Sequence, residues 1–346
     1  MENLHPIVNA DLEAIIASVP ELERLRGKTV LITGAAGFIP FYLTAVLLHL
    51  NMARQWGIRV LALIRDKAKR HRFAPFEGVA GLEFVVQDVT APLAITEDVH
   101  YVIHGASPAS PKFFATDPVG TLDANVVGTR NILGFANAQK SEGVLFLSGG
   151  EVYGVPDTVP TRETDLGRLD PLSVRSSYAE SKRMGETMCM AFAHQYGVRA
   201  IIARLYHTYG PGLTLTDGRV FADFVRDILA RRDIVLTSDG SASRTFCYIS
   251  DAAAGLYRVL LTGAPGAYNI SNDRCEITIR GLAELLVGLY PELHLKVIVD
   301  ETRTPKGYAR SPIFRASPCI DKARALGFSP SVGLAEGFRR TIASYR

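Results

Sequence analysis

The sequence has almost no excess of charge of either sign. Its 346 residues include 38 Lys and Arg against 35 Asp and Glu, which leaves a formal net charge of +3. A protein that binds nucleic acid through its phosphates needs a strongly basic face, so we expect no nucleic-acid partner. With 47% apolar and 21% charged residues, the composition is that of an ordinary globular protein of one large domain or two closely joined ones.

Cysteines and long apolar runs are also scarce. The four cysteines are scattered, without the paired spacing of a metal site: Cys189, Cys247, Cys275 and Cys319. We therefore expect no metal, and thiols in a reducing compartment. No apolar run approaches the ~18 residues of a membrane span, and the first four residues open no signal peptide. We expect a cytoplasmic protein without a membrane partner.

Short apolar runs alternate with helical patterns over the first 204 residues. This alternation predicts an α/β fold, a Rossmann-type doubly wound parallel sheet over residues 27–204. Its six predicted strands are 28–33, 59–64, 82–87, 101–104, 144–147 and 198–203.

Two regions flank this dinucleotide-binding domain. Residues 1–26 form a predicted helical extension, with a helix over 8–26 that Pro20 bends or splits. Residues 205–346 are predicted to form a smaller, interleaved substrate-binding lobe that closes over the carboxyl ends of the strands. The helices of this lobe are expected near 219–231, 250–262, 278–289 and 334–344.

The first predicted strand runs into a glycine turn and then a helix, which is the context of a dinucleotide site. Gly34 permits the tight turn, and Gly37 lets the backbone approach a pyrophosphate at the helix N-terminus, beside Phe38 and Ile39. Pro40 is bulky where such folds favour a small residue, although a first helical turn tolerates its missing N–H.

The end of the second predicted strand bears on the choice of cofactor. Arg65, followed by Lys67 and Lys69, suits the 2′-phosphate of NADP, whereas an acidic residue there would suit NAD. A solvated charged turn is the alternative interpretation. Asp88 and Val89 follow the third strand, where we expect the adenine side of the cofactor.

A loop of small residues follows the fourth predicted strand. Such loops at strand carboxyl ends border the ligand in open α/β sheets. We therefore expect Ala106 and Ser107 to contact the cofactor, and Ser107 also the substrate.

Tyr178 and Lys182 are four residues apart in a predicted helix, so they share one face. A nearby cation favours a phenolate, and the tyrosine can then accept a proton well below its ordinary pKa of ~10. The pair is a predicted catalytic site, because a dinucleotide site lies upstream.

Together these segments resemble the extended short-chain dehydrogenases/reductases of the nucleotide-sugar epimerase/dehydratase type. The resemblance covers almost the whole chain beyond the N-terminal helix. It is carried by residues 33–39 (TGAAGFI), 151–154 (EVYG), 178–182 (YAESK), 209–211 (YGP) and 244–251 (RTFCYISD). Three segments are most similar to UDP-glucuronate decarboxylases, also called UDP-xylose synthases: 106–111, 178–189 and 217–224.

The resemblance implies roles for single residues. Tyr178 would be the base that removes the proton of the sugar 4-hydroxyl, and Lys182 would bind the nicotinamide ribose and tune the tyrosine. Arg219 and Arg244 would surround the nucleotide diphosphate. The resemblance also implies NAD as cofactor, a nucleotide-sugar substrate, and a homodimer through two long helices, about 117–140 and 178–196.

The sequence departs from the family at the loop after the fifth strand. Gly149 stands where the family has a serine or threonine, and Ser148, one residue earlier, is the remaining hydroxyl. Gly150 replaces the aspartate that dehydratases use as an acid, which disfavours a 4,6-dehydratase. Glu151 stays a candidate acid/base, or else a carboxylate that holds the loop. His207 stands for a frequent asparagine and either contacts substrate phosphate or packs.

The predicted reaction is a redox-neutral decarboxylation of UDP-glucuronate through a 4-keto sugar. A nucleotide-sugar 4-epimerase shares the first half-reaction and is the alternative. Residues 62–66 also resemble carbonyl reductases, so an NADPH-consuming ketoreductase is a further alternative. The last alternative is a protein that binds the cofactor without turnover, because Gly149 and Pro40 depart from the family pattern.

Overall fold

The computed structural model describes residues 4–303 and 313–346. A seven-stranded parallel sheet forms its centre, in the order β12-β8-β5-β4-β1-β2-β3. The seven strands are β1 (Thr29–Thr33), β2 (Arg59–Ile64), β3 (Leu82–Val86), β4 (Tyr101–His104), β5 (Gly143–Gly149), β8 (Ala200–Leu205) and β12 (Gly266–Ile270). The predicted doubly wound fold is confirmed, because the chain starts at β1, builds outward to β3 and then builds the other half.

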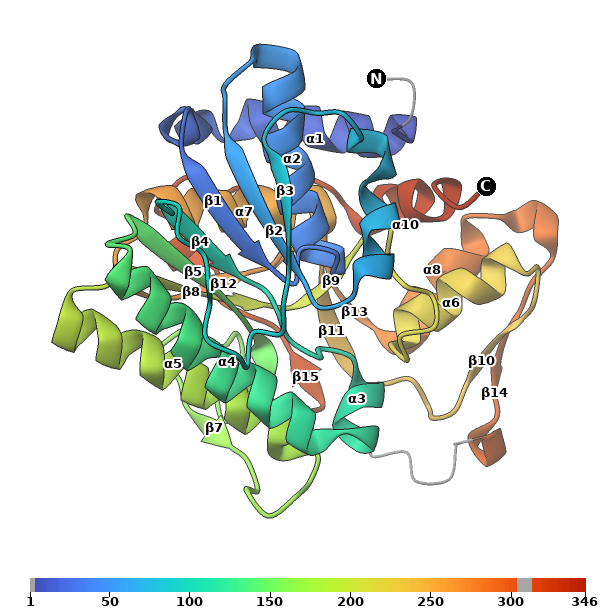
Figure 1. The fold of residues 1–346 in the computed structure, drawn as a ribbon. Helices are drawn as coiled ribbons and strands as arrows, with labels where there is room; N and C mark the ends of the chain where they lie inside the picture. Colours follow the sequence, from blue (N-terminus) through green and yellow to red (C-terminus); the bar gives the residue numbers. More distant parts are fainter. Residues whose placement is uncertain (1–3, 304–312) are drawn as a thin grey trace.

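Helices cover both faces of the sheet (Figure 1). On one face lie α1 (Pro6–Ser18), α2 (Phe38–Arg54) and α7 (Ile249–Thr262), and on the other α4 (Pro118–Ala138) and α5 (Ser176–Tyr196). Successive side chains of β1 enter different cores, because strand side chains alternate between faces: Val30 and Ile32 join the α2 side and Leu31 the α4 side. Burial on both faces explains why these strands read as continuous apolar runs.

The N-terminal extension packs against α2 and α7. Its helix α1 stops at Ser18, and a 3₁₀ turn, η1 (Pro20–Leu25), follows, so the predicted split at Pro20 is confirmed. Asp11 of α1 is fully buried and accepts hydrogen bonds from the hydroxyls of Tyr248 (2.8 Å) and Tyr42 (3.3 Å). This carboxylate therefore links the extension to two other parts of the chain.

The lobe beyond β8 is interleaved with the sheet domain. Although α7 and β12 lie inside the predicted 205–346 lobe, β12 pairs in parallel with β8 and extends the sheet. Six predicted strands were therefore one too few, since the seventh arrives after an excursion into the lobe. The division of the chain into 1–26, 27–204 and 205–346 stays a prediction.

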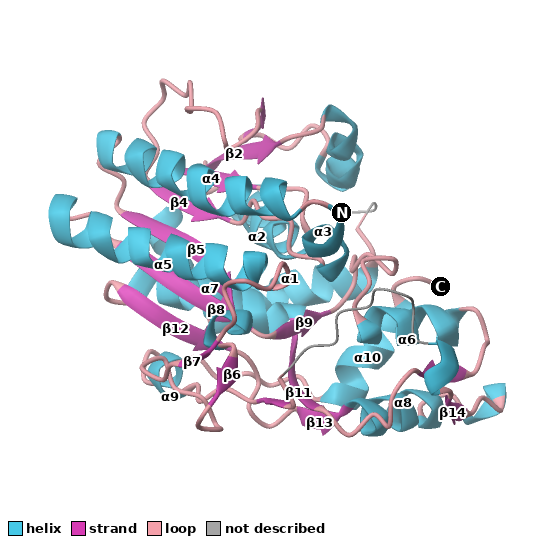
Figure 2. Cartoon of the chain, turned by 90° about the horizontal axis from the view of Figure 1, so that it is seen from below, coloured by secondary structure: helices cyan, strands magenta, loops and turns pink. Residues whose placement is uncertain are grey.

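The remaining elements of the lobe gather at one end of the molecule, except α9 (Asp321–Arg324), which lies beside β12 (Figure 2). They are β9 (His207–Tyr209), α6 (Val220–Leu229), β10 (Ile234–Leu236), β11 (Ser243–Tyr248), β13 (Glu276–Thr278), α8 (Ile279–Gly288), η4 (Pro291–Leu293), β14 (Val297–Val299), η5 (Glu301–Arg303), β15 (Arg315–Ala316), α9 (Asp321–Arg324) and α10 (Leu334–Ala343). Short elements connect the sheet strands: η2 (Lys67–Phe76), α3 (Pro111–Thr116), η3 (Gly150–Tyr153), β6 (Val155–Pro156) and β7 (Gly167–Arg168).

No helix in residues 4–303 or 313–346 is both long and apolar enough to cross a membrane. Within the same ranges, no group of three His, Cys, Asp or Glu side chains is placed to hold a metal ion.

Candidate active site

The glycine turn after β1 packs directly against the loop after β4. Gly34 has φ +65°, and a Cβ there would lie 2.8 Å from the Cα of Ala106. The Gly37 N–H donates to the Gly34 carbonyl at 2.7 Å, and Gly37 begins α2 without a side-chain cap. The first N–H groups of α2, at Phe38 and Ile39, therefore have no side-chain acceptor, which is the arrangement that suits a phosphate.

Pro40 fits this turn because two glycines make room for its ring. It is the third residue of α2, where an N–H would have no intrahelical partner. A Cβ at Gly105 would lie 2.6 Å from the Cγ of Pro40, and one at Gly37 would lie 3.5 Å from its Cδ. The bulk of the proline is thus accommodated by the missing side chain of Gly105.

A buried hydrogen-bond network holds the two loops together. The Thr33 hydroxyl lies 2.8 Å from Nδ1 of His104 and accepts from the Ala106 N–H at 3.1 Å. His104 Nε2 lies 3.1 Å from the hydroxyl of Thr129, which itself donates to the Asn125 carbonyl. Burial lowers the pKa of His104 to about 3, so the ring is neutral and acts as a fixed link.

The carboxyl ends of β2 and β3 bring Arg65 and Asp88 together. A guanidinium nitrogen of Arg65 lies 3.8 Å from Asp88 Oδ2, and the arginine side chain is 77% exposed. The Thr90 N–H and hydroxyl both donate to Asp88, and these bonds lower the pKa of its carboxyl. Val89 is buried against Gly128 of α4 and does not face this pair.

Tyr178 lies in the first turn of α5, with its ring stacked on Phe114 of α3. The two ring centroids are 4.5 Å apart and the planes differ by 13°. Burial raises the pKa of the Tyr178 phenol to about 12, Arg219 lowers it and Glu151 raises it further. The sequence predicts that Lys182 lowers this pKa. In the structure the pKa is raised instead, so that prediction is wrong.

Lys182 is buried one turn later on the same face, as predicted. Its ammonium donates to the Leu147 carbonyl at 2.7 Å and lies 5.9 Å from the centroid of the Tyr178 ring. Burial lowers its pKa to about 7. The ammonium is turned toward the end of β5, and this orientation explains its weak effect on the phenol.

Ser148 does not take the part of the missing hydroxyl. It donates to Glu186 Oε1 at 2.6 Å, and Glu186 is ion-paired with Arg204 at 2.6 Å. Because neighbouring residues of a strand face opposite sides, Ser148 points into this buried pair while Gly149 faces Tyr178. The Ser148 hydroxyl is thus used by Glu186, and a catalytic role for Ser148 stays a prediction.

The Tyr206 ring leaves no room for a side chain at position 150. A Cβ at Gly150 would lie 2.9 Å from Cζ of the Tyr206 ring. The ring thus occupies the space in which a side chain at 150 would begin. Glu151, next in the chain, is half-buried and lies 3.4 Å from a guanidinium nitrogen of Arg175.

Arg219 joins the lobe to the loop after β4. It begins α6, donates to the Ala109 carbonyl at 3.1 Å, and lies 3.4 Å from Asp217 Oδ2. The Ser110 hydroxyl donates to the Asp217 carbonyl, so two contacts close this junction. Arg219 thereby stands near both Tyr178 and the loop that holds Ser107, whose own buried hydroxyl has no partner among the described residues.

The other two predicted substrate residues have contacts within the lobe. His207 lies between Phe221 and Phe246, and burial together with the nearby Arg244 lowers its pKa to about 3. Its Nδ1 is buried and has no hydrogen-bond partner in the part of the chain that the structure describes, so the ring packs and leaves one polar atom unpaired there. Arg244 donates to the carbonyls of Ile313 (2.8 Å) and Phe314 (3.0 Å) and holds that segment beside β11.

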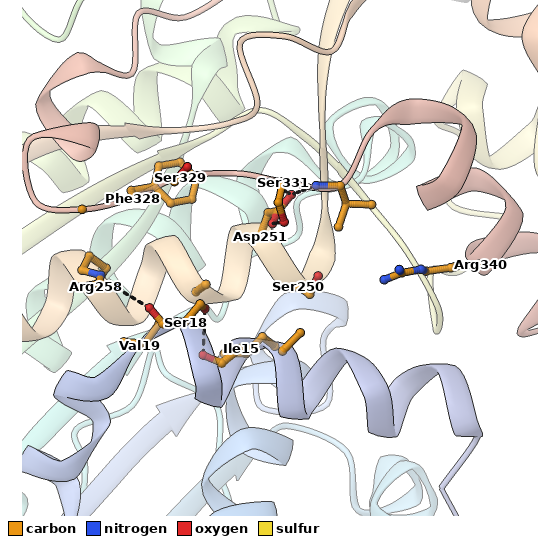
Figure 3. Close-up of a pocket in the computed structure, with 14 residues that line it drawn as sticks. Ile15, Ser18, Val19, Ser250, Asp251, Arg258, Phe328, Ser329, Ser331 and Arg340 are labelled. Atoms are coloured by element: carbon orange, nitrogen blue, oxygen red, sulfur yellow. Dashed lines mark hydrogen bonds between the residues drawn. The ribbon is translucent and has the colours of Figure 1, made fainter.

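A separate cavity of about 350 Å³ lies between α1, α7, α10 and residues 327–332 (Figure 3). Asp251 accepts there from Ser331, and Arg258 donates to the Ser18 carbonyl. None of the predicted site residues lines this cavity. It therefore belongs to the junction with the N-terminal extension and not to the candidate active site.

Some residues of the site were not predicted from the sequence. Phe114 gave no local signal, because its place against Tyr178 depends on how α3 folds back. Glu186 could have been found, since it lies eight residues after Tyr178 on the same helix face and a buried carboxylate needs a cation.

The residues present fit a nicotinamide dinucleotide. The uncapped start of α2, the close approach of Gly34 to Ala106, and the unpartnered hydroxyl of Ser107 form a cradle at the carboxyl ends of the strands. Tyr178 and Lys182 lie beside the carboxyl end of β5, at the same edge of the sheet.

Comparisons with known proteins agree with this geometry. Residues 30–271 match the model of the NAD dependent epimerase/dehydratase family. The UDP-glucuronic acid decarboxylase 6 of Arabidopsis thaliana is 34% identical over 310 residues, which cover 89% of this chain and 86% of that protein. The UDP-glucose 4-epimerase of Thermotoga maritima, solved with UDP-glucose, shares the fold with a TM-score of 0.80 at 23% identity over 92% of this chain and 98% of that one.

A dTDP-glucose 4,6-dehydratase of Streptomyces venezuelae, solved with NAD bound, has a TM-score of 0.77 and 26% identity, and the match covers 92% of this chain and 97% of that one. The glycine turn, the Tyr178–Lys182 pair and the family match all lead to one conclusion. The chain is an enzyme that belongs to the NAD dependent epimerase/dehydratase family.

Proposed function

We propose that this enzyme decarboxylates UDP-glucuronate through a transient 4-keto sugar. The observation that carries the proposal concerns two adjacent positions, Gly150 and Glu151. Glu151 is close enough to raise the pKa of the phenol, whereas Tyr206 fills the space of a side chain at Gly150. The site thus keeps a base for oxidation at C4 and a carboxylate beside it, but offers no acid at 150 for expelling a 6-hydroxyl. The 34% identity to a plant UDP-glucuronic acid decarboxylase supports the same choice.

The first step is a proton transfer to Tyr178 from the sugar 4-hydroxyl. When bound, oxidised nicotinamide dinucleotide accepts the hydride of C4 and returns it later, and its positive ring favours the phenolate. Phe114 fixes the plane of the phenol by stacking, and Lys182, which donates to the Leu147 carbonyl, would hold the nicotinamide ribose. Arg219 adds positive charge near the phenol, which favours its ionised form.

Loss of carbon dioxide follows from the chemistry of the 4-keto acid. The carboxylate is β to the new ketone, so the electrons of the broken bond are stabilised as an enolate. Glu151, oriented by Arg175 at 3.4 Å, is the candidate that takes up a proton from solvent and passes it to C5. The pentose ketone then regains hydride at C4, and Tyr178 returns its proton.

For the cofactor we propose NAD, with binding of NADP tolerated. The family is NAD dependent by its description. Arg65 offers no acceptor to a ribose 2′-hydroxyl, but its exposed guanidinium, loosely paired with Asp88, can approach a 2′-phosphate.

We further propose a cytoplasmic homodimer that pairs α4 and α5 of two copies. The helices lie side by side on one face of the sheet (Figure 2). Both expose apolar side chains: Val119, Leu122 and Val127 on α4, and Met184, Met190 and Tyr196 on α5. Such a surface is costly in water and typical of an interface. All four cysteines are free thiols, in keeping with a reducing compartment.

Mass spectrometry of the reaction mixture tests the proposed reaction. The full chain is incubated with UDP-glucuronate, UDP-glucose or dTDP-glucose, each with and without NAD or NADP. Decarboxylation gives a UDP-sugar lighter by one carbon dioxide from UDP-glucuronate alone. An unchanged mass with a new chromatographic peak would mean 4-epimerisation, and loss of water would mean dehydration. Net consumption of NADPH would mean a ketoreductase.

A further inference from the structure

Two adjacent glycines, Gly149 and Gly150, stand at the end of β5, and the structure accounts for the missing side chain at only one of them. At Gly150 a side chain is excluded, because its Cβ would lie 2.9 Å from the Tyr206 ring. At Gly149 nothing excludes one. Among the described residues, only Tyr178 and Leu205 have atoms within 4 Å of a Cβ built there, at 3.5 and 3.6 Å. These are ordinary van der Waals distances.

The backbone does not require glycine at 149 either. Its φ of −150° and ψ of 161° are those of an extended strand, which any residue adopts. Neither packing nor conformation within residues 4–303 and 313–346 therefore demands the missing side chain. Its absence has a local consequence only for its nearest neighbour, the phenol oxygen of Tyr178.

That oxygen receives no hydrogen bond from any described side chain. The hydroxyl of Ser148 is used by Glu186, and the ammonium of Lys182 by the Leu147 carbonyl. A serine at 149 would carry its oxygen on a carbon 3.5 Å from the phenol oxygen. With an ordinary C–O bond it can reach a hydrogen-bond distance of about 2.7–2.8 Å.

We propose that Gly149 withholds from Tyr178 the hydrogen-bond donor that a hydroxyl side chain would supply, and so raises the pH above which the phenol acts as a base. The proposal rests on the proposed role of Tyr178 as the base. A donor to the phenol oxygen favours the charged form, so its absence favours the neutral one. The charged groups around the phenol are Lys182 on α5, Arg219 at the start of α6 and Glu151 in η3, itself paired with Arg175.

The test compares the pH profiles of Gly149→Ser and Gly149→Ala with that of the unchanged enzyme. Gly149→Ser is expected to move the acidic limb of kcat down by roughly one pH unit, the effect of one added donor. Gly149→Ala fills the same space without a hydroxyl and is expected to leave that limb in place. An unmoved limb in Gly149→Ser, or an equal shift in Gly149→Ala, overturns the proposal.

A direct titration of the phenol separates this inference from the reaction assignment. The ultraviolet phenolate absorbance of each variant is measured against pH, and the curve of the same variant carrying Tyr178→Phe is subtracted. A lower midpoint in Gly149→Ser supports the inference even if UDP-glucuronate is not the substrate. If UDP-glucuronate is decarboxylated but the midpoint does not move, the inference fails and the proposed function stands.

Gly150→Ser provides the matched control. It adds the same hydroxyl one residue later, where Tyr206 already fills the space. We expect lower thermal stability and no shift of the Tyr178 titration. A shift equal to that of Gly149→Ser would show that the effect is not specific to position 149 and would count against the proposal.

Discussion

Burial acts in opposite directions on the two residues at the centre of the site. It raises the pKa of the Tyr178 phenol to about 12 and lowers that of the Lys182 ammonium to about 7. In both cases the neutral form is favoured, because a buried charge loses its hydration. The Tyr178 phenol therefore stays neutral until positive charge near it lowers its pKa and lets it act as a base.

Replacing Tyr178 by phenylalanine removes the proton acceptor but keeps the stacking on Phe114. We expect turnover to fall by a factor of about 10²–10⁴, the usual contribution of a general base. Binding of NAD, measured by calorimetry, should change little. Normal turnover in Tyr178→Phe would contradict the assignment of the base.

The choice of cofactor depends on Arg65 at the end of β2. We expect Arg65→Ser to weaken the binding of NADP by roughly tenfold, since a guanidinium–phosphate pair is lost. Binding of NAD should stay within about a factor of two, and calorimetric titration with both dinucleotides measures the ratio. An equal loss for both cofactors would show that Arg65 acts through the fold of the turn.

Asp11 makes the stability of the protein depend on pH. Burial raises its pKa from 3.8 to about 6, so between these values the folded state holds a proton that the unfolded state has lost. This bound proton stabilises the folded state by up to about 3 kcal/mol. The stabilisation is fully present below pH 3.8 and is lost as the pH rises through about 6.

Asp11→Asn keeps a neutral acceptor for Tyr42 and Tyr248 and removes the titration. The free energy of unfolding of the variant relative to the wild type should therefore rise between about pH 4 and pH 7. Denaturant unfolding at several pH values measures this difference. A difference that is constant with pH would mean that Asp11 does not titrate in this range.

At the scale of elements, the strand–turn–helix unit from β1 to α2 places the cofactor. Gly34 has φ +65° and lies against the backbone of Ala106, whose N–H is fixed by Thr33. An added Cβ meets both a disfavoured conformation, which costs roughly 1–2 kcal/mol, and backbone that cannot move aside.

Gly34→Ala should consequently reduce both stability and the affinity for NAD. Gly27→Ala is the matched control, because Gly27 has φ +69° and, apart from its chain neighbours, no atom of the described residues lies within 4 Å of an added Cβ. It should lose a similar backbone contribution to stability and keep its affinity for NAD. Equal losses of affinity in the two variants would remove the special role of the glycine turn.

At the scale of the whole molecule, α4 and α5 form a face with exposed apolar side chains. Val127→Glu and Met184→Glu each place a charge on this face, away from the site. If the proposed dimer forms there, light scattering after gel filtration should show a shift from dimer to monomer at micromolar concentration. Thermal stability measured at one concentration should fall as well, because association with a second subunit no longer stabilises the folded state.

The sequence by itself determined the parts of this protein that depend on neighbours in the chain. The six predicted strands, the turn at Gly34 and the helix carrying Tyr178 and Lys182 lie where the sequence predicts them, and the strand ends differ by at most two residues. Local patterns suffice there, because strand burial, backbone conformation and helical spacing are set within a few residues.

Only the tertiary structure decided which distant groups meet. It placed Phe114 on Tyr178, Tyr206 over Gly150, and Ser148 on Glu186, and it added β12 to the sheet. The acidity of Tyr178 belongs to the same class. Spacing shows that a lysine shares its helix face, but the direction of that ammonium and the depth of burial arise from segments far apart in the chain, and burial was the larger effect.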